Sequence, residues 1–166
     1  MDKLFDKYLA KPILFDAIIV IVIWLSTKQF AFIDYKVIDR INQINILPYI
    51  ICTAVSLAGF ILAALTIIVT VKSNLQAKGI EEAENALELI FSSKHYDSVV
   101  TVFKKSLIEL TFCFLLILIV WVSADNLSIR TINRFNITGI LLTALSLIRS
   151  LYILFYVLNL SKYKRE

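Results

Sequence analysis

The feature that most constrains this chain is a set of four long apolar stretches. The clearest one, residues 47–71, runs for 25 residues without a charged side chain, and Pro48 fits its first turn, where the missing N–H of proline costs no hydrogen bond. A helix that crosses a bilayer needs about 20 apolar residues, and the stretches 12–32, 106–123 and 137–160 approach or reach that length. The pattern predicts an all-α integral membrane protein whose single domain, residues 1–166, contains four transmembrane helices.

The composition points to the bilayer as the solvent of these helices. Of the 166 residues, 59% are hydrophobic and 18% are charged, and the mean hydropathy is +0.81. Soluble domains carry about 45–50% apolar and about 25% charged residues. Because a water-soluble core of this size cannot hide so much apolar surface, we exclude a soluble enzyme domain.

Basic residues indicate on which side of the membrane each segment lies. The N-terminal segment, the 72–105 loop and the C-terminal tail together contain 11 Lys and Arg residues, whereas the other two loops contain 5. Cytoplasmic loops carry the excess of basic residues in membrane proteins. We therefore expect a multi-pass protein of the bacterial inner (plasma) membrane, with both termini and the 72–105 loop in the cytoplasm.

The cytoplasmic loop contains a predicted short amphipathic helix. In the sequence GIEEAENALELIF, acidic residues occupy the first turn and apolar residues recur on one side: Ala83, Ala86, Leu87, Ile90 and Phe91. This helix would extend the second span, lie on the membrane or dock a partner. The last option gives an alternative function, a membrane-anchored scaffold that recruits a cytosolic protein.

Arg149 lies near the centre of the fourth span, where a charge costs about 2.5 kcal/mol or more. On its helical face lie further polar residues, which form a stripe: Thr138, Ser146, Tyr152 and Tyr156. Two interpretations stay open. Arg149 either forms an ion pair with Glu109 or Asp16 that fixes helix packing, or it faces a water-filled cavity and sets charge selectivity or ligand response.

A stripe of small or weakly polar residues runs along the second span with a seven-residue period: Cys52, Ser56, Gly59, Ala63, Thr66, Thr70 and Ser73. This is the spacing of a left-handed helix seam, and small residues let helix backbones approach closely in lipid. The stripe indicates tight helix packing or an oligomer interface. The alternative is the wall of a pore formed by several copies.

Basic residues gather near the inner mouth of the third span: Lys94, His95, Lys104 and Lys105. Such clusters set topology and contact anionic lipid. They also suit a nucleotide or short nucleic acid held through its phosphates.

The sequence lacks the motifs of the enzyme classes considered. It contains no P-loop, no His-Glu-x-x-His, no Gly-x-Ser-x-Gly and no Gly-x-Gly-x-x-Gly. Its single histidine, His95, has no paired nucleophile or metal ligand nearby in sequence. We therefore expect no enzymatic activity, no cofactor and no metal.

Two segments, VSLAGFILAALTIIVTVK and FSSKHYDSVVTVFKKSLIEL, flank the predicted amphipathic helix. Together they resemble small bacterial four-span membrane effectors of anti-phage defence, including the Hailong-type channels. The resemblance covers the second and third spans, about half of the chain. It implies an oligomer that is gated by the nucleotide product of a partner nucleotidyltransferase, with the small-residue stripe as assembly or pore element and the basic residues as ligand sensor.

These observations favour a homo-oligomeric inner-membrane channel or membrane-disrupting effector, gated from the cytoplasm by a ligand or the product of an operon-encoded partner. A single four-helix bundle has no wide lumen, so conduction needs several copies, and we expect a tetramer. The scaffold is the alternative. A small secondary transporter, with Arg149 as its substrate group, is the third interpretation.

Overall fold

The computed structural model describes residues 8, 11–29, 39–75 and 95–160, and it confirms the prediction of an all-helical protein. The helices are α2 (Pro12–Gln29), α3 (Arg40–Leu75), α5 (His95–Val122) and α6 (Ile129–Leu160), with a short 3-10 turn η2 (Ala124–Asn126) between the last two. The predicted amphipathic helix within 80–91 lies outside the described residues.

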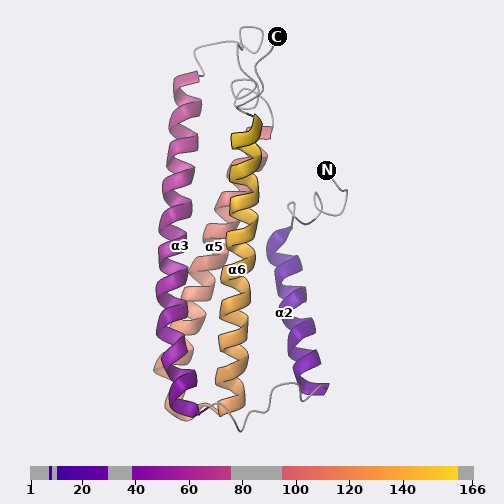
Figure 1. Cartoon of the computed structure of the whole chain (residues 1–166), viewed down its shortest axis with the longest axis vertical. Helices are drawn as coiled ribbons and strands as arrows, with labels where there is room; N and C mark the ends of the chain where they lie inside the picture. Colours follow the sequence, from indigo (N-terminus) through magenta and orange to yellow (C-terminus); the bar gives the residue numbers. More distant parts are fainter. Residues whose placement is uncertain (1–7, 9–10, 30–38, 76–94, 161–166) are drawn as a thin grey trace.

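Consecutive helices run in opposite directions (Figure 1). The long helices α3, α5 and α6 pack as a bundle, and α2 stands beside it. The starts of α2 and α5 and the ends of α3 and α6 lie at one end. We call it the basic end because the sequence segments that adjoin it carry 11 Lys and Arg residues, against 5 in the segments that adjoin the other end.

Three of the helices are long and apolar enough to cross a membrane, and this agrees with the prediction of a membrane protein. They contain Arg40–Thr70, Tyr96–Val122 and Ile129–Phe155. The apolar part of α2, Pro12–Ser26, is shorter than these three.

The helices are longer than the apolar stretches that predicted them. α3 begins at Arg40, α5 at His95 and α6 at Ile129, each several residues before the predicted span. The predicted 72–105 loop is therefore helical over 72–75 and 95–105. Hydropathy marks only the part of a helix that lies in hydrocarbon, whereas backbone hydrogen bonding continues through polar flanks.

The prediction that Pro48 lies in the first turn of a helix was wrong. Because α3 begins at Arg40, Pro48 lies inside the helix and not in its first turn. Proline lacks the N–H that would bond the carbonyl oxygen of Ile44, four residues earlier. The helix nevertheless continues, and the neighbouring Leu47 and Ile50 are buried against the bundle.

The inward face of α3 follows its own seven-residue period. Its residues at that spacing are buried: Leu47, Ala54, Ile61 and Ile68. The last three pack in one apolar cluster with Phe103 and Leu110 of α5. This face holds the three long helices together.

The end opposite the basic end is closed by polar contacts to the α5–α6 connection. The Arg40 side chain donates hydrogen bonds to the carbonyl oxygens of Ala124 (2.7 Å) and Asp125 (3.1 Å). The Asn136 side chain donates to the carbonyl oxygen of Gln43 at 2.9 Å. These bonds fix the start of α3 against η2 and α6.

Two glycines give a matched test of this packing. A Cβ at Gly139 of α6 would lie 2.7 Å from Cγ2 of Ile50 and 3.1 Å from Cδ1 of Ile117, whereas a Cβ at Gly59 of α3 would meet nothing within 4 Å. We expect Gly139→Ala to destabilise the protein by about 1–3 kcal/mol because the close helix contact is overpacked. Gly59→Ala should change stability by less than about 1 kcal/mol. Thermal unfolding in detergent checks both, and equal effects would contradict this packing.

Candidate functional site

Arg149 lies at the centre of a buried polar cluster that joins three helices. Only 1% of its surface is exposed. Its Nη1 lies 2.7 Å from Oδ2 of Asp16 on α2, and its Nη2 forms an ion pair with Oε2 of Glu109 on α5. Its Nε donates to the Ser106 hydroxyl at 3.1 Å. We call Arg149, Asp16, Glu109 and Ser106 the Arg149 cluster.

Tyr8 extends the Arg149 cluster just before α2. Its hydroxyl donates to Oδ1 of Asp16 at 3.0 Å and accepts a hydrogen bond from Nη1 of Arg149 at 3.4 Å. Burial and the neighbouring Asp16 carboxylate raise the pKa of Tyr8 to about 12. The phenol therefore keeps its proton at neutral pH and remains a donor to Asp16.

The structure brings together both of the carboxylates that sequence reasoning considered for Arg149. This geometry corresponds to the ion-pair interpretation, because the guanidinium is enclosed and bonded to two acids. The Arg149 cluster carries one positive and two negative formal charges. It therefore has a formal excess of one negative charge when both acids are ionised.

The predicted polar stripe on α6 divides into two parts. Ser146 is buried and donates to the carbonyl oxygen of Ser106 at 3.3 Å, so it supports the Arg149 cluster. Thr138 is also buried, farther along α6. Tyr152, by contrast, is 39% exposed. The Tyr156 side chain lies outside the described part of the structure.

The small-residue stripe of α3 is exposed along its length, on the side away from the other helices: Cys52, Ser56, Gly59, Ala63, Thr66, Thr70 and Ser73. Thr66 and Thr70 donate to the carbonyl oxygens of Leu62 and Thr66, at 2.9 Å each. Their hydroxyls are thus satisfied within α3. The stripe is not used for packing within this bundle.

The predicted phosphate-binding residues are only partly described. Lys104 is exposed and Lys105 is half-buried, both on α5 near the basic end. Lys94 and the side chain of His95 lie outside the described residues. At the same end, Nζ of Lys72 lies 3.6 Å from the centre of the Tyr96 ring, a cation–π contact that joins α3 to α5.

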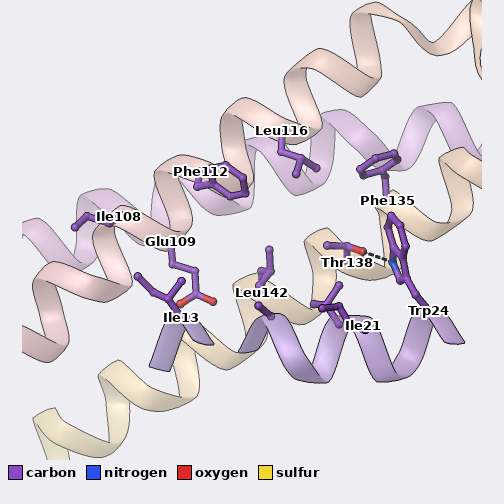
Figure 2. Close-up of a pocket in the computed structure, with 12 residues that line it drawn as sticks. Ile13, Ile21, Trp24, Ile108, Glu109, Phe112, Leu116, Phe135, Thr138 and Leu142 are labelled. Carbon is purple, nitrogen blue, oxygen red and sulfur yellow. Dashed lines mark hydrogen bonds between the residues drawn. The ribbon is translucent and has the colours of Figure 1, made fainter. Parts of the chain in front are cut away.

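A cavity of about 500 Å³ lies between α2 and the pair α5 and α6 (Figure 2). Most of its wall is apolar, and Glu109 lies at one end of it, with Trp24 and Thr138 at the other. The indole N–H of Trp24 donates to the Thr138 hydroxyl at 2.9 Å. Among the described residues, no three His, Cys, Asp or Glu side chains are grouped to hold a metal.

Sequence reasoning missed Ser106, Tyr8 and Trp24. Ser106 precedes Glu109 by three residues, so helical spacing could have placed it on the same face. Tyr8 and Trp24 carried no such signal, because their contacts depend on how α2 docks against α6. The buried amides Gln43, Asn133 and Asn136 were also missed.

Comparison of the chain with protein-family models, with curated proteins and with solved structures gave no match.

The balance of charges in the Arg149 cluster predicts how substitutions there change the free energy of unfolding. Arg149→Leu leaves Asp16 and Glu109 buried without a cation, and we expect a loss of about 3–5 kcal/mol in the free energy of unfolding. Glu109→Gln should cost less, because the Arg149–Asp16 pair remains and is neutral. Combining Arg149→Leu with Glu109→Gln and Asp16→Asn should recover part of the loss. Denaturant titration in lipid–detergent micelles measures all four proteins, and a fully stable Arg149→Leu variant would contradict this account.

Proposed function

We propose that the chain is the subunit of a homo-oligomeric inner-membrane channel or membrane-disrupting effector. In this proposal α2, α3, α5 and α6 all cross the membrane, with both termini in the cytoplasm. A cytosolic ligand, such as the product of an operon-encoded partner enzyme in anti-phage defence, opens the channel. The proposal is supported mainly by the outward face of α3.

The outward side of α3 carries a continuous exposed stripe of small residues. Large exposed side chains such as Phe60, Leu62 and Ile67 flank this stripe. The exposed face of α5 has large side chains without such a stripe: Ile108, Phe112, Leu115, Ile119 and Val122. Small residues allow a second helix to approach closely in lipid, where packing contacts drive association. A second copy of this chain supplies such a helix, so the stripe favours self-assembly.

Self-assembly is also what conduction would require. The interior between α3, α5 and α6 is filled by apolar side chains such as Ile61, Phe103 and Leu110. Arg149 is enclosed by its partners and lines no channel within one copy. In our proposal the pore therefore lies between copies, around a central axis, and four copies remain our expectation.

The orientation follows from the sequence segments that adjoin the basic end, which carry 11 Lys and Arg residues against 5 in the segments at the other end. An excess of Lys and Arg is typical of the cytoplasmic side. We place this end in the cytoplasm. The apolar part of α2, Pro12–Ser26, is shorter than the about 17 apolar residues of the shortest spanning helices, so in our proposal α2 crosses a locally thinned bilayer. Of the predicted ligand residues that the structure describes, Lys104 is exposed, and in our proposal it contacts a phosphate-bearing ligand.

Two exposed threonines provide a matched test of assembly. Thr66 lies in the stripe, and Thr111 lies on the large-residue face of α5. Each hydroxyl donates to a carbonyl oxygen four residues earlier at 2.9 Å, so each Thr→Leu change loses the same bond. We expect Thr66→Leu to weaken the oligomer and Thr111→Leu to leave it intact. Light scattering of purified protein in detergent measures this, and equal behaviour would contradict the proposed interface.

The two cysteines provide a second test without an added label. Cys52 is exposed in the stripe and Cys113 is buried. If stripes of neighbouring copies face each other, oxidation of membranes with copper phenanthroline should give disulfide-linked dimers through Cys52. The dimers should disappear in Cys52→Ser and persist in Cys113→Ser. Dimers that depend on Cys113 would contradict this arrangement.

Ion flux from liposomes tests the function itself. Wild-type protein should release a trapped ion when ATP or short oligonucleotides are added on the cytoplasmic side. The flux should be lost in Thr66→Leu and kept in Thr111→Leu, because only the first variant disturbs assembly. Protein that stays monomeric and moves no ions under these probes would overturn the proposal.

The scaffold alternative depends on the face of Leu87, Ile90 and Phe91, which lies outside the described residues. Polar replacements on that face that abolish partner binding and leave ion leakage unchanged would favour it. The transporter interpretation needs Arg149 as a substrate group. Transport that survives Arg149→Leu would count against it.

A further inference from the structure

The cavity lies beside α2, which is joined to the bundle by two polar connections and by apolar contacts of Val20. Near its start, Asp16 pairs with Arg149 of α6. Near its end, Trp24 donates to Thr138, and its ring lies edge-on to Phe135 with 5.8 Å between ring centres. Between these two points lies the cavity of about 500 Å³ (Figure 2). This volume falls in the range of small-molecule sites, about 300–1,000 Å³.

The wall of the cavity is apolar and meets the outer surface of the protein. Several of the side chains that line it are also exposed: Ile21 by 57%, Ile108 by 61% and Phe112 by 62%. In a bilayer this surface faces hydrocarbon. An apolar molecule dissolved in the membrane can therefore enter from the side.

One polar group in this wall has no partner. Glu109 is 4% exposed, and its Oε2 is bound to Arg149, but among the described residues its Oε1 has no hydrogen-bond donor. Thr138, at the other end, differs because its hydroxyl accepts from Trp24 and donates to the carbonyl oxygen of Arg134. A buried acceptor without a donor is costly, so a molecule that supplies one gains selectivity.

The charge of the Arg149 cluster indicates which donor is favoured. Arg149 supplies one positive charge, and Asp16 and Glu109 supply two negative charges when ionised. A cation at Oε1 of Glu109 would balance the cluster. Hydrogen bonds between ionised groups are also stronger than those between neutral groups.

We propose that this cavity binds a single-chain amphiphile whose head is a protonated amine. The ammonium group donates to Oε1 of Glu109, and the hydrocarbon chain lies along the apolar wall toward Trp24. The site is a lateral opening to the membrane within one copy of the chain. It does not depend on the proposed channel or on its assembly.

Trp24 makes the site measurable. The sequence contains two tryptophans, so Trp121→Phe leaves Trp24 as the reporter at the far end of the cavity. This protein is placed in phosphatidylcholine nanodiscs and titrated with ω-bromododecylamine or ω-bromododecanol, whose bromine quenches indole fluorescence on contact. We expect the amine to reach half-maximal quenching at a mole fraction about tenfold lower than the alcohol, because only the amine makes a charge-assisted bond.

Two variants separate the head-group contact from the cavity. Glu109→Gln should bring the amine and alcohol curves together, because the amide carries no charge. Ala17→Leu places a larger side chain in the wall of the cavity and should weaken saturable quenching by both probes. Ala144→Leu makes the same change at an exposed position outside the cavity and should leave quenching intact.

Two results would overturn the proposal. Identical curves for amine and alcohol in the Trp121→Phe protein would show that Glu109 does not select the head group. Saturable quenching that Ala17→Leu leaves unchanged would show that the probes bind elsewhere. If Glu109→Gln fails to fold, these two comparisons still decide the question.

Discussion

The buried guanidinium of Arg149 is the constraint on which the arrangement of α2 depends. A charge enclosed in an apolar medium is stable only when it is paired and its hydrogen bonds are satisfied. Arg149 finds one carboxylate on α2 and another on α5, so the pairing draws two helices toward α6 at a single level. The same cluster leaves one buried oxygen of Glu109 without a hydrogen-bond donor, and the Glu109 side chain also lines a cavity. One charged side chain thus explains both the docking of α2 and the chemistry beside it.

The second constraint is the difference between the two faces of α3. The inward face carries Leu47, Ile61 and Ile68, which pack against the other long helices. The outward face repeats with the same period but with small residues, and within one copy it remains exposed. A helix with two seams is suited to join a bundle on one side and a neighbouring copy on the other. In our proposal, this links the fold of one chain to its function as an oligomer.

Apolar length and periodicity were sufficient to predict the helices, the stripe on α3 and both candidate partners of Arg149. They could not give the helix ends, because α3 begins at Arg40 in a polar flank that hydropathy does not mark. They also could not show that Arg149 reaches Asp16 and Glu109 together, since that depends on how the helices are staggered. The cavity was unpredictable for the same reason, because its shape depends on how α2 docks against α5 and α6.

The most direct test of the central claim is the distance between α2 and α6 in a bilayer. Spin labels at Ile18 and Ile148, which are exposed and lie within two residues of Asp16 and Arg149, report this distance by pulsed electron paramagnetic resonance. The labelled protein carries Cys52→Ser and is diluted with unlabelled chains. We predict one narrow distance distribution, which becomes broad when Arg149→Leu is added. An unchanged narrow distribution in that variant would contradict the claim that Arg149 holds α2 in place.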